Sequence, residues 1–484
     1  MVNNCVLKGL KPEGVFEFFG EILAVPRPSK HEGKMTEYLL NWANRRGLEH
    51  ERDAIGNVII RKGATKGMEN KPWVCLQAHI DMVCEKNGDK CFDFMKDAIE
   101  PRIENGWLMA TGTTLGADDG IGVATALAVL DAKDVEHGPI ECLFTVDEET
   151  GLSGANALSP TALKSRILLN LDSEDEGEMF IGCAGGVDTL AKLPFEREDT
   201  PRGAYFRICV KGLKGGHSGD DINKGLGCAN KLLNRILWEA DKEMDMRLAC
   251  FNGGNLRNAI AREAYAEVVV TEQEAEDLRR LVEKFSGDLK YEFRSTEPNM
   301  QITMESIAKP AFVVDMLSQD NLLNVLYACP HGVLAMSREI PNFVETSTNL
   351  ASVKTEENHF FITTSQRSSV ESAKVAAASR VESCFLLAGA DVEHTDGYPG
   401  WAPNTDSHVL KVAVEAYKKL FGKEPVVRAI HAGLECGLIG EKYENMDMIS
   451  YGPTLRGVHS PEERLEIATV DLFWRHTLEI LKNI

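Results

Sequence analysis

The chain has 484 residues, of which 43% are hydrophobic and 26% are charged, and its formal net charge at pH 7 is −21. This length and composition are typical of a globular protein with two domains. The excess of acidic residues argues against nucleic acid or an anionic membrane as a partner, because contacts to phosphate groups need Lys and Arg.

Neither a membrane span nor a signal peptide is predicted. The best candidate for a span, residues 121–130, is much shorter than the roughly 20 residues that cross a bilayer. The first five residues lack the basic and apolar regions of a signal peptide. The twelve cysteines lie mostly in apolar runs and form no Cys-x-x-Cys pair, which favours reduced, buried thiols. We therefore expect a cytoplasmic protein.

The first part of the chain is predicted to alternate between helices and strands. Helices are expected from residue 12 to about residue 25, over residues 35–46 and over residues 119–130. Strands are expected over residues 57–61 and in the apolar run that ends at His79. This alternation is typical of an α/β fold with a mostly parallel sheet.

The pattern changes near residue 188 and changes back near residue 391. Between these points, strands and helices mix in a way that indicates antiparallel α+β structure. The expected strands there are 205–211, 263–270 and 360–365, and the expected helices are 229–238 and 272–285. Downstream, helices are expected at 407–420 and 470–481, with a strand near residue 448. We therefore predict an α/β domain from residues 1–188 and 391–484, with residues 189–390 inserted as an α+β domain.

Four apolar runs each stop at residues that can bind a metal ion. Residues 74–78 precede His79 and Asp81, 140–146 precede Asp147, Glu148 and Glu149, 167–171 precede Asp172, and 448–451 lead through Gly452 and Pro453 to His459. Short apolar runs predict buried strands, and ligands of open α/β sheets bind beyond the carboxyl ends of such strands. One strand ending in this way would mean little, but four indicate a polynuclear metal site.

Two pairs of adjacent acidic residues add to this prediction. Asp118 and Asp119 lie at a predicted helix start, where one carboxylate can bridge two cations while the other caps the helix. A Gly-x-Gly follows, but the dinucleotide-binding pattern is incomplete and the acidic residues would repel a pyrophosphate. Glu148 and Glu149, if extended, point to opposite sides, so one can bind metal while the other acts as general base.

Five residues would then form two mixed nitrogen–oxygen sites around one shared carboxylate. They are His79, Asp118, Glu149, Asp172 and His459. Imidazole and carboxylate ligands suit zinc, manganese or cobalt. Two such ions about 3.5–4 Å apart can lower the pKa of a bridging water and polarise a carbonyl group.

In order along the chain, these motifs resemble those of the co-catalytic zinc peptidases, a family that includes carboxypeptidases, tripeptidases and carnosinases. The motifs are 79–81, 116–120, 147–151, Asp172 and 452–460. Further segments are most similar to aminoacyl-histidine dipeptidases, which cleave Xaa-His. They are 113–118, 182–186, 211–219 and 431–437. The resemblance extends over essentially the whole chain, with Asp119 in place of the Asn of some members.

The resemblance implies a role for each residue of the centre. His79 and Asp172 would bind one zinc ion, Glu149 and His459 would bind the other, and Asp118 would bridge the two ions. The peptide bond between Asp118 and Asp119 would be cis. Cobalt or manganese would substitute for zinc. Glu148 would take a proton from a water that bridges the two ions and pass it to the leaving amine. Asp81 would hold His79 or tune Glu148.

The resemblance also makes the α/β domain catalytic and the inserted domain a lid through which a homodimer forms. His217 would donate to the oxyanion, in some relatives from the partner subunit, although a structural loop histidine is the alternative. Arg367 would bind the C-terminal carboxylate of the substrate. Asn258 in the lid and Glu435 at the substrate amine are further candidates, each with an equally strong structural alternative.

The expected function is therefore metal-dependent hydrolysis of dipeptides that have a free N-terminus and preferably a C-terminal histidine, β-alanyl-histidine included. The alternatives are a tripeptide aminopeptidase or an N-acyl amino-acid deacylase of the same clan. A binding protein without activity ranks lower, because such a protein would have lost ligands or the base, and both are present.

Overall fold

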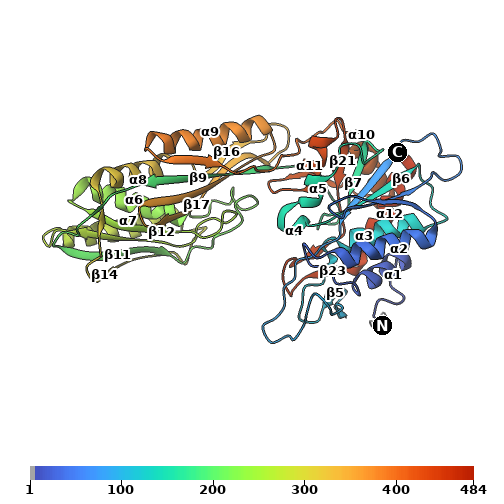
Figure 1. Ribbon diagram of the computed structural model, residues 1–484, viewed down its shortest axis with the longest axis horizontal. Coiled ribbons are helices and arrows are strands. Elements are labelled where there is room, and N and C mark those ends of the chain that lie inside the picture. Colours follow the sequence, from blue (N-terminus) through green and yellow to red (C-terminus); the bar gives the residue numbers. More distant parts are fainter. Residues whose placement is uncertain (1–5) are drawn as a thin grey trace. The chain divides into compact units, whose positions relative to one another are not determined.

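The computed structural model describes residues 6–484, which form two compact units. The first unit runs to Gly182 and continues over Pro403–Ala429 and Leu434–Ile484. The second unit comprises Cys183–Ala402 and Ile430–Gly433. Figure 1 shows both units coloured along the sequence, and the blue and the red segments both belong to the first unit.

An eight-stranded sheet forms the centre of the first unit, in the order β1-β2-β6-β3-β7-β21-β8-β20. The strands are β1(Glu49–Arg52), β2(Val58–Lys62), β3(Val74–His79), β6(Ile140–Thr145), β7(Ile167–Asn170), β8(Glu178–Cys183), β20(Val426–Ile430) and β21(Asp447–Ser450). β6, β3, β7 and β21 are mutually parallel neighbours, whereas β1, β2 and β8 pair antiparallel. The predicted α/β fold with a mostly parallel central sheet is thus confirmed for the four inner strands.

The inner strands are rich in apolar residues, as expected where helices cover both faces of a parallel sheet. Every residue of β3 and β6 is buried. The helices of this unit are α1(Glu13–Ile22), α2(Gly33–Arg46), α3(Ala117–Asp131), α4(Glu148–Gly151), α5(Ser153–Ala157), α10(His408–Phe421), α11(Glu435–Lys442) and α12(Ile467–Asn483). A small sheet joins β4(Pro101–Glu104), β5(Trp107–Ala110), β22(Leu455–Arg456) and β23(Arg464–Glu466).

The second unit is built on a nine-stranded antiparallel sheet, with the path β14-β11-β13-β12-β17-β18-β9-β19 and β16 paired to β17. Its strands are β9(Gly185–Pro194), β11(Ala204–Lys211), β12(Arg247–Gly253), β13(Ala264–Val270), β14(Gln301–Ser306), β16(Gly332–Met336), β17(Val344–Thr355), β18(His359–Ser368) and β19(Asp391–His394). The short β10(Arg197–Glu198) and β15(Val313–Val314) pair separately.

Four helices pack on this sheet and share one hydrophobic core with it (Figure 1). They are α6(Ala229–Glu243), α7(Ala275–Glu292), α8(Met316–Ala328) and α9(Glu371–Leu387). Along β11, buried and partly exposed residues alternate, as expected for a sheet covered on one face. The unit begins before residue 189 and extends past residue 390, because β9 and β19 pair with each other within its sheet.

Two further sequence predictions concern membranes and disulfides. Within residues 6–484, no helix combines the length and the apolar character that a bilayer span requires. Among the cysteines of this range, no disulfide bond forms.

Candidate active site

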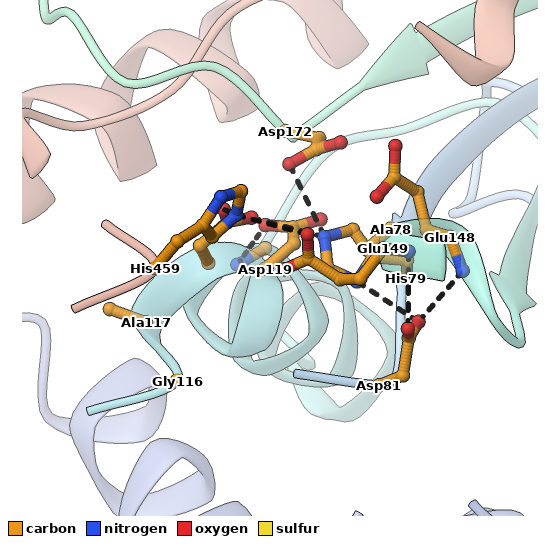
Figure 2. A network of polar contacts seen from close by, with 12 residues as sticks. Ala78, His79, Asp81, Gly116, Ala117, Asp119, Glu148, Glu149, Asp172 and His459 are labelled. Atoms are coloured by element: carbon orange, nitrogen blue, oxygen red, sulfur yellow. Dashed lines mark hydrogen bonds and ion pairs between the residues drawn. The ribbon is translucent and has the colours of Figure 1, made fainter. Parts of the chain in front are cut away.

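The candidate metal ligands lie together because four neighbouring parallel strands end at one edge of the first unit's sheet. His79 is the last residue of β3, Glu149 follows β6, and Asp172 follows β7. His459 lies on the loop between β22 and β23, and Asp118 is on the kinked first turn of α3. Figure 2 shows the side chains of His79, Glu149, Asp172 and His459 converging from separate segments.

Asp118 lies between two imidazoles and offers one carboxylate oxygen to each. Its Oδ1 is 3.0 Å from Nε2 of His79, and its Oδ2 is 3.2 Å from Nε2 of His459. On the outer sides, Asp172 Oδ1 is 3.6 Å from His79 Nε2, and Glu149 Oε2 is 2.9 Å from His459 Nε2. Two groups of possible ligands, each with one histidine and two carboxylates, therefore share Asp118.

The arrangement of these atoms fits two divalent cations. Ligand atoms about 2.0–2.2 Å from a zinc ion are roughly 3–3.5 Å from one another, which matches the spacings found here. Oε1 of Glu149 is buried without a hydrogen-bond partner, although a buried carboxylate oxygen normally has one. Mixed imidazole and carboxylate donors suit zinc, manganese or cobalt. The residues present thus fit a dinuclear centre.

The pKa values of the clustered side chains also indicate that positive charge is favoured between the carboxylates. Hydrogen bonds to Asp118 and Glu149 raise the pKa of His459 to about 11. Burial acts to raise the pKa of Asp118, but hydrogen bonds from His459 and His79 outweigh burial and lower it. Concentrated carboxylates therefore stabilise any cation among them, whether a proton on an imidazole or a metal ion.

The two aspartates at the start of α3 have different partners. The peptide bond between Asp118 and Asp119 is cis, as the family resemblance implied. Asp119 turns away from the histidines, and its Oδ1 accepts the N–H of Gly122 at 3.1 Å. A Cβ at Gly122 would lie 2.3 Å from this oxygen, so glycine is required for the contact. Asp119 thus caps the regular part of the helix, and Asp118 is left to face the histidines.

Glu148 and Glu149 begin the short helix α4 and are not extended, which corrects the expectation that they simply point to opposite sides of a strand. Asp81 holds this turn, because its Oδ1 and Oδ2 accept the N–H groups of Glu148 and Glu149 at 3.0 and 3.2 Å. The same Oδ1 lies 3.3 Å from Nδ1 of His79. Asp81 therefore positions one candidate ligand and the acidic pair at once (Figure 2).

The carboxylate of Glu149 faces His459, whereas the carboxylate of Glu148 does not pair with this histidine and is available for proton transfer. Burial raises the pKa of Glu148 well above its ordinary value. A carboxylate with a raised pKa accepts and returns a proton more easily near neutral pH, which is the property required of a general base. Its carboxylate also lies in the group formed with His79 and Glu149, so it borders the candidate metal site.

His217 and Asn258 line one surface cavity of about 940 Å³ in the second unit. Nδ1 of His217 accepts the N–H groups of Gly219 and Asp220 at 3.3 and 3.2 Å, so the ring proton belongs on Nε2. Burial and the charge of Arg367 lower the pKa of His217. The loop therefore presents a neutral imidazole whose Nε2–H is a free donor.

Arg367 also belongs to the second unit and is only 7% exposed. Its Nη1 donates to the hydroxyl of Tyr398 at 2.9 Å, and its Nε has no hydrogen-bond partner. Among residues 6–484, no carboxylate forms an ion pair with this guanidinium. A buried cation without a counter-ion is suited to bind an anionic group of a ligand.

Glu435 is enclosed rather than presented to a substrate. Its exposed fraction is 0%, and its Oε2 accepts hydrogen bonds from Gln77 Nε2 at 2.6 Å and Thr145 Oγ1 at 2.7 Å. Burial raises the pKa of Glu435 to about 7. These contacts favour the structural alternative, in which Glu435 links β3 and β6 beneath the candidate metal site.

Two buried charged residues beside the site were not predicted from the sequence. Arg27 and Glu463 are each 2% exposed and contact the loop that carries Asp118. In the sequence, the only indication of a role for Glu463 was its position four residues after His459. The depth of a charged side chain, however, depends on segments that are distant in the sequence.

Comparison with known proteins agrees with this site. The model of peptidase family M20/M25/M40 matches residues 75–481. The chain is 45% identical over 479 residues to a cytosol non-specific dipeptidase of Escherichia coli strain K12, with 99% of each chain covered.

Solved structures show the same relationship. The crystal structure of aminoacylhistidine dipeptidase from Vibrio alginolyticus has 45% sequence identity and a TM-score of 0.93, covering 99% of this chain and 98% of that chain. Aminopeptidase PepT from Bacillus cereus, with 18% identity and a TM-score of 0.57 over 98% of each chain, shares the fold. The chain therefore belongs to peptidase family M20/M25/M40 and is a hydrolase acting on peptide bonds.

Proposed function

We propose that this protein is a dinuclear metal-dependent dipeptidase that prefers C-terminal histidine, β-alanyl-histidine included. The observation that carries the proposal is Asp118, whose two oxygens face the imidazoles of His79 and His459. The names of two relatives that are 45% identical to this chain, a non-specific dipeptidase and an aminoacylhistidine dipeptidase, support dipeptides as the substrate class.

Zinc is the proposed cation at both positions, with cobalt or manganese able to replace it. His79, Asp118 and Asp172 would hold one ion, and Asp118, Glu149 and His459 would hold the other. When bound, the two cations lower the pKa of water and stabilise negative charge on the carbonyl oxygen of the substrate.

Glu148 is the proposed general base and then the general acid. It takes a proton from the attacking water and delivers that proton to the amine that leaves. Asp81 accepts the backbone N–H of Glu148 at 3.0 Å and so keeps the proposed base in place. Positioning of this kind lowers the barrier because little orientation remains to be gained in the transition state.

His217 and Arg367 are the proposed substrate contacts of the second unit. The Nε2–H of His217 would donate to the carbonyl oxygen as negative charge develops there. Arg367 would bind the C-terminal carboxylate with its unpaired guanidinium. Asn258, exposed in the same cavity as His217, is a further candidate contact.

A panel of substrates tests the proposal. Metal-loaded enzyme would be assayed on β-alanyl-histidine, on other Xaa-His dipeptides, on dipeptides without histidine, on tripeptides and on N-acetyl amino acids. We expect the highest kcat/KM for Xaa-His, loss of activity on chelation, and recovery with zinc, cobalt or manganese. Amidation of the substrate's C-terminus should raise KM in the native enzyme but have little further effect in Arg367→Ala.

The other outcomes of the panel separate the alternatives. Preferential cleavage of tripeptides would identify an aminopeptidase, and cleavage of N-acetyl amino acids would identify a deacylase. Binding of peptides without turnover by the metal-loaded protein would contradict enzymatic activity on this panel.

We further propose a cytoplasmic homodimer that forms through the second unit. The cytosolic relative supports the location, and exposed apolar residues on α9, Val375 and Leu387 among them, support a contact surface. If His217 serves the partner's site, mixing inactive His217→Ala with inactive Glu148→Ala subunits should restore part of the activity. No recovery after verified subunit exchange would mean that His217 acts within its own chain.

A further inference from the structure

Two buried charged side chains that the proposed mechanism does not use lie on either side of the Asp118 loop. Arg27 precedes α2 in the sequence, and Glu463 precedes β23. Both are 2% exposed and belong to the first unit. A charge buried so completely is unfavourable unless hydrogen bonds satisfy it, so the partners of each side chain indicate its role.

Glu463 binds four successive peptide N–H groups. Its Oε2 accepts from Leu115 at 2.7 Å and from Gly116 at 2.9 Å. Its Oε1 accepts from Ala117 at 2.7 Å and from Asp118 at 3.3 Å. The loop that carries the bridging aspartate is therefore wrapped around one carboxylate.

The same glutamate is tied closely to His459. The chain between them turns tightly, with a left-handed φ of 62° at His459. The N–H of Glu463 donates to the carbonyl of Ser460 at 3.0 Å. Glu463 therefore joins the loop that carries Asp118 to the turn that carries His459.

Arg27 makes the corresponding link to β3. Its Nη1 donates to the carbonyls of Ile80 at 3.1 Å and Asp81 at 2.5 Å, and its Nη2 donates to the carbonyl of Gly116. A Cβ at Gly116 or Gly120 would lie 2.6 or 2.7 Å from Nη2. Gly116 and Gly120 thus leave room for Arg27 between the end of β3 and the Asp118 loop.

We propose that Glu463 and Arg27 are positioning residues that fix Asp118 for two different cations. Glu463 serves the cation shared with His459, and Arg27 serves the cation shared with His79. The inference rests on the proposed two-cation centre. A bridging carboxylate must satisfy both ions at once, so a small displacement of its loop weakens binding at one side.

Metal titration of apoenzyme tests this assignment without any peptide substrate. Native protein, Glu463→Gln and Arg27→Lys would be titrated with zinc by calorimetry and with cobalt by visible absorption. Gln keeps the size of the side chain but replaces one acceptor oxygen with an NH₂ group that opposes two N–H groups. Lys keeps the charge but lacks the guanidinium fork that reaches three carbonyls.

We expect each variant to bind one ion as the native protein does and the other about 10- to 100-fold more weakly. A double-mutant comparison identifies the affected ion. Glu149→Gln lacks a ligand of the His459 group and is expected to bind one ion. Adding Glu463→Gln to this variant should reduce metal affinity little further, whereas adding Arg27→Lys should weaken binding of the remaining ion. Glu462→Gln, at the exposed neighbouring glutamate, is the matched control and should bind both ions normally.

Two results would overturn the proposal: native affinity for both ions in Glu463→Gln, or equal weakening of both ions in a folded variant. Circular dichroism of the apoenzymes checks folding, and Glu463→Asp, which retains the charge on a shorter side chain, replaces the Gln variant if that one is unfolded. If native protein binds two ions but cleaves no peptide, the proposed function fails while this assignment stands. If native protein does not bind two ions, both fail together.

Discussion

At the scale of single residues, two neighbours with the same side chain have different surroundings. The carboxylate of Glu149 lies 2.9 Å from His459, whereas Glu148 is half-buried and burial raises its pKa. Asp81 accepts both backbone N–H groups and so fixes the two carboxylates relative to each other. The proposed distinction between ligand and base therefore rests on the geometry of one turn.

The proposed roles predict that the same substitution at the two positions changes the metal content differently. Glu148→Gln should lower kcat by about 10²- to 10⁴-fold while two metal ions remain bound, because a general base is not a ligand. Glu149→Gln should lose one ion as well as activity. Metal content by plasma emission spectrometry, measured beside kcat, distinguishes the two. Metal loss confined to the Glu148 variant would exchange the assignments.

At the scale of elements, α12 and α10 meet at a buried histidine. His476 donates from Nε2 to the carbonyl of Ala413 at 2.9 Å, and its ring lies edge-on to Tyr417 and Tyr451. Burial lowers the pKa of His476 from 6.5 to about 4. The packed helices therefore require the neutral imidazole, and protonation favours the unfolded state.

Stability should depend on pH through this contact. As pH falls from about 6.5 to about 4, the unfolded chain gains a proton at His476 before the folded protein does, so stability is lost on acidification. At pH 5 the loss from this group is about 2 kcal/mol. His476→Gln should be less stable than native protein at pH 7.5, and this deficit should shrink by that amount at pH 5.

Urea unfolding of both proteins at the two pH values measures the effect. His408→Gln, at an exposed histidine of α10, serves as the control and should follow the native protein at both pH values. A deficit of His476→Gln that is the same at pH 7.5 and pH 5 would show that the helix contact does not depend on the neutral ring.

At the scale of the whole molecule, every candidate metal ligand belongs to the first unit. The second unit has its own sheet and its own hydrophobic core. Metal binding to the folded state stabilises the part of the structure that holds the ligands. The two units are therefore expected to respond differently to chelation.

Hydrogen exchange followed by mass spectrometry should reveal this difference. Removal of metal should increase exchange in residues 79–81, 115–122, 147–151 and 459–463, where the ligand loops lie. The strands β11, β13 and β17 of the second unit should keep their protection, because no candidate ligand belongs to that unit. A loss of protection as large in these strands as in the ligand loops would contradict the independence of the two units.

The sequence by itself determined that the candidate metal ligands lie together at one edge of a sheet. Apolar runs that end at His79, Glu148 and Asp172 predict buried strands whose carboxyl ends meet at one edge of a sheet, and β3, β6 and β7 do so. This inference works because strand burial and side-chain chemistry are both local properties of the chain. The motifs, taken in order, also indicated the peptidase family.

Only the tertiary structure decided which partners each of several similar charged side chains has. Asp119 accepts a hydrogen bond from the N–H of Gly122, whereas Asp118 faces the two histidines. Glu435 accepts hydrogen bonds from Gln77 and Thr145 and is buried. The partners of Arg27 and Glu463 lie 53 or more residues away along the chain. Burial and hydrogen bonding of a charged group depend on such distant atoms, so no local pattern in the sequence specifies them.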